Sequence, residues 1–205
     1  MKNLNLAVLA STSGTDLQAI IDEIDSGKLE NVNLKCVIAN KDCGALKKAR
    51  KAGIEDILIE SEGKEREEFD KLVAEDLEKR DVELIVLIGY MRYLSKWFVN
   101  KYENQIMNVH PSLLPAFAGG MDLNVHEEIL KHGVKVTGCT IHFVDEGKDT
   151  GPIIIQRCIP VDEDETEETL KEKVQALEKE AYPEAIRLYR DGKLKVEGRK
   201  VKILD

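Results

Sequence analysis

The chain lacks the cysteine patterns and apolar segments of secreted, zinc-binding or membrane proteins. Its four cysteines form no C-x-x-C pair and no spacing typical of zinc ligands. Cys36, Cys139 and Cys158 lie in apolar runs and are expected to pack as small apolar side chains. There is no apolar core of a secretory signal, and no apolar run approaches the length that spans a bilayer. These absences predict a cytoplasmic protein without a metal site or a membrane contact.

An excess of positive charge is also missing. Lys and Arg number 30 against 39 Asp and Glu, which gives a formal net charge of −9. A surface of this sign repels a polyphosphate backbone, so nucleic acid is not an expected partner. A small anionic substrate is still allowed, because a few backbone N–H groups can hold one phosphate.

The first glycine-containing loop, residues 11–16, has neither a Walker lysine nor the G-x-G-x-x-G pattern, which argues against nucleoside triphosphates and dinucleotides. It lies between an apolar strand and a helical segment. Glycine there lets backbone N–H groups converge, and the helix N-terminus adds partial positive charge. A single phosphate site and a plain strand-to-helix turn are both compatible with these residues.

Apolar runs alternate with helical patterns through the first half of the chain. Strands are expected at residues 4–10, 32–39, 56–60, 82–88 and 105–109, and helices at 17–24, 45–49 and 65–80. This alternation predicts an α/β fold. Its central sheet would be doubly wound and mainly parallel, with helices on both faces and ligands at the carboxyl ends of the strands.

After residue 105 the pattern changes. A loop is expected at 116–124, a helix at 125–131, and a helix of roughly 24 residues from Thr166, which the acidic residues of its first turn favour. Two long strands, 135–145 and 152–161, are joined by a connection short enough for a hairpin. The tail, 193–203, alternates like an edge strand. The second half thus adds antiparallel carboxy-terminal strands to the Rossmann-like sheet.

An amide, an imidazole and a carboxylate occur on two proline-stiffened segments. Asn108 and His110 precede Pro111, and Asp149 follows about 34 residues after Pro115. An amide donor and an imidazolium can hold a developing oxyanion, and a carboxylate can keep the imidazole protonated. No Ser or Cys nucleophile is adjacent to the histidine. These residue types predict acyl transfer without a covalent enzyme intermediate.

Other histidines and one further loop are open to two interpretations. His142 faces the site or is a satisfied structural histidine, whereas His126 and His132 are expected to be solvated. The loop at 89–94 follows the most apolar strand, and its Met and Tyr suit an aromatic heterocycle while its Arg suits a carboxylate. A hydrophobic cap over the sheet edge is the alternative.

Taken together, these segments resemble the phosphoribosylglycinamide formyltransferases, folate-dependent enzymes of purine synthesis. The resemblance extends over almost the whole chain. It rests on residues 13–21, 91–92, 108–115, 138–144, 149–153 and 182–183. It implies the formyltransferase fold in a single domain, 1–205, with a phosphate-binding half at 1–100 and a catalytic and folate-binding half at 101–205.

The resemblance also implies the roles of individual residues. The residues that match the catalytic set are Asn108, His110 and Asp149. Those that match the contacts to glycinamide ribonucleotide are Gly14, Thr15, Asp16 and Glu178. Those that match the contacts to the co-substrate, 10-formyltetrahydrofolate, are Arg66, Met91, Arg92, Tyr93, Leu94 and Asn108. The partners implied are these small molecules, and a homodimer is compatible with the resemblance.

Two departures from the family bear on these roles. Asp16 replaces a usual Asn, and a carboxylate facing a phosphate repels it. Either backbone N–H groups dominate binding and Asp16 turns outward as a helix cap, or the substrate is altered. The loop at 116–124 is about three residues longer than usual, so its gating is expected to differ, with Gly119 and Gly120 as a hinge.

Three alternative functions remain open. A methionyl-tRNA formyltransferase would share the catalytic trio, but an acidic chain offers no basic module for tRNA. A formyltetrahydrofolate hydrolase would use water in place of the amine, although that family carries an N-terminal regulatory domain. A catalytically silent ligand-binding homologue is the third, and the intact trio argues against it.

Overall fold

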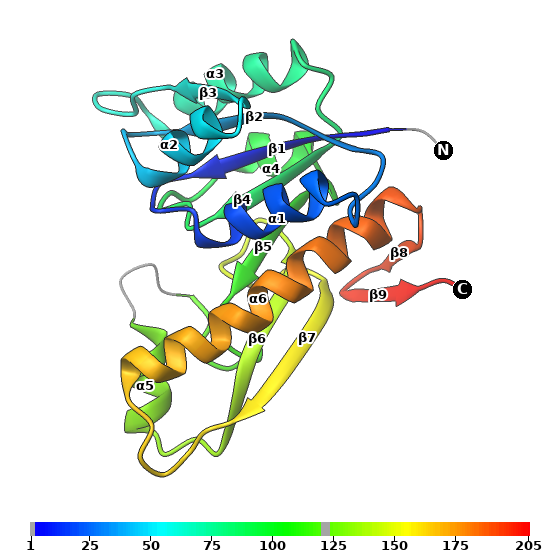
Figure 1. Cartoon of the computed structure of the whole chain (residues 1–205). Helices are drawn as coiled ribbons and strands as arrows, with labels where there is room; N and C mark the ends of the chain where they lie inside the picture. Colours follow the sequence, from blue (N-terminus) through cyan, green and yellow to red (C-terminus); the bar gives the residue numbers. More distant parts are fainter. Residues whose placement is uncertain (1–2, 120–123) are drawn as a thin grey trace. The chain divides into compact units, whose positions relative to one another are not determined.

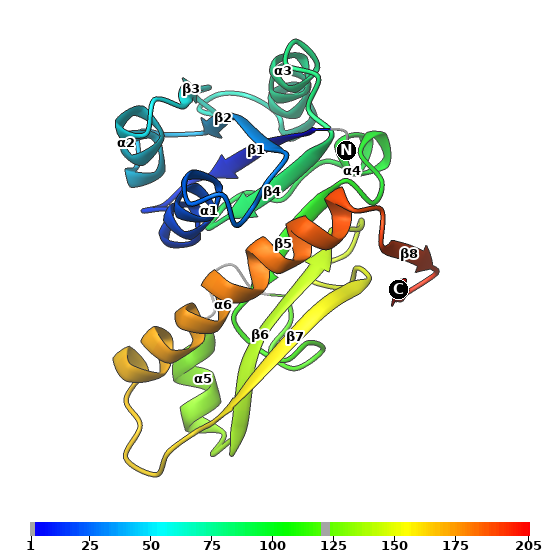
Figure 2. The ribbon, with the colours of Figure 1, turned by 45° about the vertical axis from the view of Figure 1, so that its right-hand side comes forward.

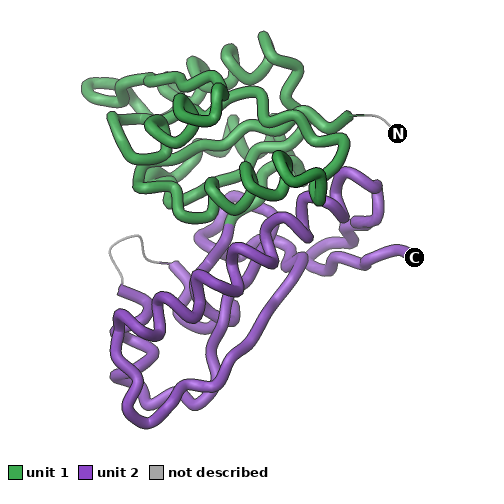
Figure 3. The backbone as a smooth tube through the Cα atoms, in the orientation of Figure 1, with its two compact units in different colours: residues 1–108 green, residues 109–205 purple. Residues whose placement is uncertain are grey.

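The computed structural model describes residues 3–119 and 124–205 and forms two compact units, residues 1–108 and 109–205 (Figure 3). No helix within these described residues has the length and apolar character needed to cross a bilayer.

The first unit contains a parallel sheet with the strand order β3-β2-β1-β4-β5 (Figure 1). Its strands are β1 (Leu4–Ala10), β2 (Val32–Ala39), β3 (Glu55–Leu58), β4 (Leu84–Ile88) and β5 (Ile106–His110), the last of which continues into the second unit. All five residues of β4 are buried, as its unbroken apolar sequence requires in a sheet that is covered on both faces.

Helices cover both faces of this sheet (Figure 2). On one face α1 (Thr15–Asp25) contacts α2 (Gly44–Lys51), and on the other α3 (Arg66–Glu78) contacts α4 (Lys96–Lys101). The chain moves outward from β1 to β3 and then returns to β4 on the other side of β1. The strand order therefore reverses between β1 and β4, which is where doubly wound sheets bind ligands.

The second unit is built on antiparallel strands. β6 (Val136–Phe143) pairs with β7 (Ile153–Pro160), and the long helix α6 (Glu167–Arg190) packs on both. The short helix α5 (Val125–Lys131) packs on α6. The tail is a hairpin of two strands, β8 (Leu194–Glu197) and β9 (Lys200–Ile203).

These elements confirm the predicted fold class: a mainly parallel, doubly wound sheet followed by antiparallel carboxy-terminal strands. The prediction of one edge strand in the tail was wrong, because the chain turns at Gly198, where φ is +60°. Cys36 and Cys139 are buried as predicted, whereas Cys158 is exposed. Near Cys158 the burial of β7 alternates, and this residue is on the exposed face.

Candidate active site

A carboxylate and two imidazoles meet in the second unit. The Asp149 Oδ2 atom lies 3.5 Å from His110 Nδ1, and its Oδ1 atom lies 3.8 Å from His142 Nε2. His110 is 6% exposed and His142 is 2% exposed. The structure therefore joins His110 and Asp149, as predicted, and adds His142 to the same carboxylate. His142 is buried with a partner at each ring nitrogen and lies beside Asp149, so its contacts fit both of its interpretations.

Local backbone geometry produces this arrangement. His110 is the last residue of β5, and Asp149 lies in the β6–β7 connection with φ of +54°. The register of β6 against β7 shifts between Ile141 and His142. A β-bulge of this kind re-aims the side chain beside it, and bulges are common next to functional sites. The shift accompanies the placement of the His142 ring against Asp149.

Each imidazole has a backbone carbonyl at its other nitrogen. His110 Nε2 lies 3.0 Å from the Phe117 carbonyl oxygen, and His142 Nδ1 lies 2.8 Å from the Phe143 carbonyl oxygen. A carbonyl can only accept, so these nitrogens carry the proton. In both rings the second nitrogen then faces the Asp149 carboxylate, which favours the charged form of each ring.

Burial opposes that preference and outweighs it. Desolvation lowers the pKa of His110, against the raising effect of Asp149 and of the Phe117 carbonyl. The pKa of His142 is lowered for the same first reason, while the Phe143 carbonyl and Asp149 raise it and His110 lowers it further. The imidazolium expected from the sequence is therefore the disfavoured form of His110 in the free chain.

The segment after His110 is held by a network on β6 and β7. Thr140 Oγ1 donates to the Ser112 carbonyl at 2.7 Å and accepts from the Leu114 amide at 3.0 Å. Gln156 Nε2 donates to the Leu114 carbonyl and to Thr140 Oγ1, both at 3.0 Å. The Leu114–Pro115 peptide is cis. The segment that follows His110 is thus held by polar side chains of two strands, of which Thr140 is buried and Gln156 is exposed.

The loop after Pro115 contacts His110 and Asp149 directly. Besides the Phe117 carbonyl on His110, the Gly119 amide donates to Asp149 Oδ2 at 3.0 Å. Gly119 has φ of +96°, a conformation that glycine adopts readily and that is compatible with a hinge. In the structure, however, its amide is hydrogen-bonded to the Asp149 carboxylate. Gly120, the other residue of the predicted hinge, lies outside the described residues.

Asn108 stands two residues before His110 on β5. Residues i and i+2 of a strand lie on the same face, so β5 presents the amide and the imidazole to one side. Asn108 is half-buried and is not without an interaction partner in the protein. The predicted donor pair thus shares a strand.

The first loop ends in a left-handed glycine at the start of α1. Gly14 is the N-cap of α1 with φ of +67° and ψ of +56°, and no side chain caps this helix. The amides in the first turn of any helix have no intrahelical partner, and in α1 no N-cap side chain accepts from them. Thr15 and Asp16 begin α1. Asp16 is 6% exposed, so the outward cap considered for its side chain is not observed.

The loop after β4 combines an exposed apolar side chain with the guanidinium of Arg92, and Arg66 of α3 reaches it from outside the loop. Met91 is 45% exposed. The Arg92 guanidinium lies over the Phe69 ring at 4.4 Å from the centroid, and that of Arg66 lies 5.9 Å from the Tyr93 centroid. Leu94 is half-buried in the same loop. The predicted folate residues therefore gather within the first unit, at the carboxyl end of β4.

Asp70 is a buried carboxylate beneath this loop that sequence reasoning missed. It is 1% exposed and accepts a hydrogen bond from the Ser95 amide at 2.6 Å. Burial raises its pKa, against the lowering effect of Ser95, Arg92 and Arg66. The Ser95 hydroxyl in turn caps α4 by accepting from the Phe98 amide. Ser95 just before an aromatic pair was the available signal for this cap and for α4.

The remaining predicted residues lie on helices of the second unit. Glu178 is on α6 and is 6% exposed. His132 is exposed, as predicted, but His126 is only 9% exposed, which corrects the prediction that it is solvated. The face of α5 that packs on α6 includes this histidine. Among the described residues, no group of three or more His, Cys, Asp or Glu side chains could hold a metal ion.

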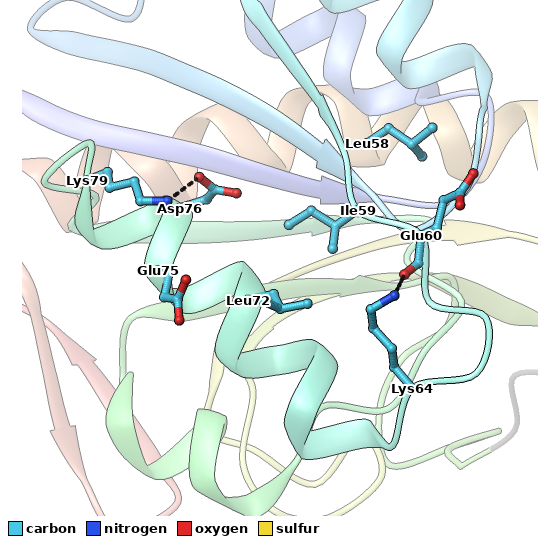
Figure 4. Close-up of a pocket in the computed structure, with 8 residues that line it drawn as sticks. All are labelled: Leu58, Ile59, Glu60, Lys64, Leu72, Glu75, Asp76 and Lys79. Carbon is cyan, nitrogen blue, oxygen red and sulfur yellow. Dashed lines mark hydrogen bonds and ion pairs between the residues drawn. The ribbon is translucent and has the colours of Figure 1, made fainter.

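A groove of about 530 Å³ lies elsewhere in the first unit, beside β3 and α3 (Figure 4). The residues that line it are Leu58, Ile59, Glu60, Lys64, Leu72, Glu75, Asp76 and Lys79. None of the predicted site residues is among them. The groove is open and lined by charges of both signs, so it does not alter the assignment of the site.

Comparison with known proteins places the chain in a family. The sequence model of the family described as "Formyl transferase" matches residues 4–186. Phosphoribosylglycinamide formyltransferase of Escherichia coli (strain K12) is 37% identical over 195 residues, which cover 94% of this chain and 90% of that protein. The trifunctional purine biosynthetic protein adenosine-3 of Gallus gallus is 43% identical over 94% of this chain, and the chain spans only 19% of its length.

A solved structure extends the likeness to three dimensions. The crystal structure of glycinamide ribonucleotide transformylase 1 from Symbiobacterium toebii has a TM-score of 0.94 at 43% identity, with 99% of this chain and 95% of that chain covered. The family match and the nearly full-length bacterial relative agree. This chain belongs to the formyl transferase family and, within it, to the phosphoribosylglycinamide formyltransferases.

Proposed function

We propose that the chain transfers the formyl group of 10-formyltetrahydrofolate to the amine of glycinamide ribonucleotide, a step of purine synthesis. The observation that carries this proposal is the pairing of His110 with Asp149. His110 ends β5, the strand that also contains Asn108. Family membership supplies the substrates.

In the proposed reaction the amine nitrogen attacks the formyl carbon, and the carbonyl electron pair moves onto oxygen. The Asn108 amide and protonated His110 donate hydrogen bonds to that oxyanion. Asp149 favours the imidazolium and takes up the amine proton through water. Collapse of the intermediate breaks the bond from the formyl carbon to the folate nitrogen, which leaves with the proton that Asp149 took from the amine.

The resting geometry adds one requirement. His110 Nε2 is engaged by the Phe117 carbonyl and Nδ1 faces Asp149, so both ring nitrogens have protein partners. For the imidazole to reach an oxyanion, the carbonyl has to leave Nε2. We therefore place a shift of residues 117–119 before the chemical step, as loop closure precedes chemistry in many enzymes.

At the ribonucleotide end, the uncapped turn at Gly14, Thr15 and Asp16 would receive the phosphate through backbone N–H groups. Glu178 would contact the ribonucleotide, as it matches the family pattern. At the folate end, Asn108 would contribute together with residues of the first unit. Those residues are Arg66, Met91, Arg92, Tyr93 and Leu94.

The proposal also covers the setting of the reaction. We propose a cytoplasmic enzyme whose two compact units act as one functional domain, since the family match runs through both. Four free cysteines fit a reducing compartment. The expected partners are the two small-molecule substrates, and a homodimer is the oligomer to test.

The deciding experiment follows formyl transfer from 10-formyltetrahydrofolate with and without glycinamide ribonucleotide. Asn108→Ala should lower kcat by roughly 10²- to 10³-fold, because one oxyanion donor is lost. His110→Ala should be at least as damaging. Asn33→Ala, an exposed asparagine on β2, is the matched control and should behave like the wild type. Release of formate without ribonucleotide would identify a hydrolase instead, and no reaction at all would favour a silent homologue.

A further inference from the structure

One hydroxyl group links the carboxyl ends of three neighbouring strands in the first unit. Ser11 follows β1, Asn40 follows β2 and Met91 follows β4, and these strands lie side by side in the sheet (Figure 1). Ser11 Oγ donates to Asn40 Oδ1 at 2.6 Å, and the Met91 amide donates to Ser11 Oγ at 2.9 Å. Ser11 is 2% exposed.

The chemistry of the hydroxyl gives these two hydrogen bonds a fixed direction. A serine has a single O–H donor and can accept with its lone pairs. Because the Asn40 oxygen receives the proton, the lone pairs of Ser11 remain for the Met91 amide. Asn40 therefore sets the orientation in which Ser11 holds the loop after β4.

Backbone contacts reinforce the same connection. The Ser11 amide donates to the Gly89 carbonyl at 3.1 Å. A Cβ atom on Gly89, which has φ of +53°, would lie 2.1 Å from Thr12 Oγ1. The first loop and the loop after β4 therefore touch at the point where the strand order reverses. The Met91 amide is held while its side chain stays 45% exposed, which leaves that side chain available to a ligand.

We propose that Ser11, oriented by Asn40, is a positioning residue that fixes the backbone of the Met91 loop against the phosphate-binding loop. The inference rests on the proposed function in one respect, namely that these two loops bind the folate and the ribonucleotide. Ser11 touches neither the reacting atoms nor the catalytic trio. Its loss should therefore weaken folate binding more than it slows the chemical step.

The test compares Ser11→Ala with the wild type by equilibrium binding of 10-formyltetrahydrofolate and by steady-state kinetics. One net hydrogen bond to the loop corresponds to roughly 3- to 10-fold in affinity. The dissociation constant and the KM for the folate should rise by about that factor. Values of kcat and of the KM for the ribonucleotide should change less than about twofold, within the scatter of neutral substitutions.

A second readout needs no substrate. Hydrogen exchange at the Met91 amide should accelerate in Ser11→Ala, whereas the core amides of β1 and β4 should keep their protection, which shows that the unit is folded. Asn40→Asp retains an acceptor oxygen for Ser11, so exchange at the Met91 amide should stay at its wild-type rate. Ser26→Ala removes an exposed serine hydroxyl from the same unit and is the matched control.

The outcomes separate this inference from the proposed function. A wild-type protein that transfers no formyl group refutes the proposed function, while Met91 exchange still reports on the hydrogen bond. Unchanged Met91 exchange in Ser11→Ala overturns the inference. So does an unchanged folate dissociation constant, or an equal rise in the KM of both substrates.

Discussion

At the scale of single residues, Asp149 is the group on which the candidate site depends. Each of its two oxygens faces one imidazole, and Oδ2 also accepts a hydrogen bond from the Gly119 amide. Burial lowers the pKa of both histidines, and Asp149 is a group that opposes this effect on each. The carboxylate therefore partly offsets the effect of burial on both histidines and also holds the backbone of the loop.

Asp149→Asn should lower the pKa of His110 further, because it removes a raising interaction and leaves the desolvation. Activity that needs the imidazolium declines as pH rises through that pKa, so this decline should move to lower pH. At neutral pH kcat should fall by roughly 10²-fold. A pH–rate profile of the variant measures both effects. Asp162→Asn is the matched control, and an unshifted profile for Asp149→Asn would contradict the pairing.

Asp16→Asn is the second prediction at this scale. Asp16 is buried in the first turn of α1, beside the amides proposed to hold the phosphate. Removing its charge should strengthen ribonucleotide binding on the order of tenfold, because a carboxylate repels a phosphate at short range. Calorimetric titration with the ribonucleotide measures the change. Unaltered affinity would place the Asp16 carboxylate out of range of the phosphate.

The candidate site residues could be named from the sequence, whereas most of their contacts could not. Asn108 and His110 were predicted from residue types two positions apart on one strand, which is local information. The Phe117 carbonyl on His110 and the Asp70 carboxylate under Ser95 were missed. Both contacts depend on how loops return to the site in three dimensions, and any residue type can supply a carbonyl.

At the scale of elements, apolar periodicity predicted most strands and helices within two residues. β4 begins at Leu84 rather than at 82, and β6 ends at Phe143 rather than at 145. The helix α4 was missed because its six residues are too few to show helical periodicity. Apolar spacing likewise gave no sign of the turn that divides the tail.

The long helix α6 offers a prediction about its start. Thr166 and Thr169 form a capping box, with each side chain accepting from the backbone of the other. Thr166→Ala should lower the free energy of unfolding by about 1 kcal/mol. Chemical denaturation measures it, and Thr166→Ser should retain most of the stability. Equal losses in both variants would assign the effect to packing instead of capping.

At the scale of the whole molecule, the histidines are distributed unevenly. All four lie in the second unit, at positions 110, 126, 132 and 142. Burial lowers the pKa of three of them, namely His110, His126 and His142. A protonated imidazole is thus disfavoured within the folded unit at three places.

This distribution predicts that acid destabilises the second unit first. Below the ordinary histidine pKa of 6.5, the unfolded chain binds protons that the folded chain does not, so stability present above that pH is lost as pH falls. Hydrogen exchange, corrected for intrinsic rates, should show lower protection in β6 and β7 at pH ~5.5 than at ~7.5. β1 and β4, in a unit without histidine, should change less.

Two substitutions test the origin of this effect. His126→Gln removes one of the three proton-binding groups and should make the pH dependence shallower. His132→Gln replaces the exposed histidine and should leave it unchanged. Equal pH dependence in the two units would contradict the histidine explanation.

The close contact between Gly89 and Thr12 also restricts the order in which this sequence can change. A side chain at position 89 collides with the threonine hydroxyl and is also strained by the φ of +53°, and a smaller residue at position 12 removes only the collision. A lineage or a mutant library would thus reach alanine at 89 only after position 12 had become smaller. The reverse order passes through a disfavoured intermediate. The two positions should therefore vary together, although 77 residues separate them in the chain.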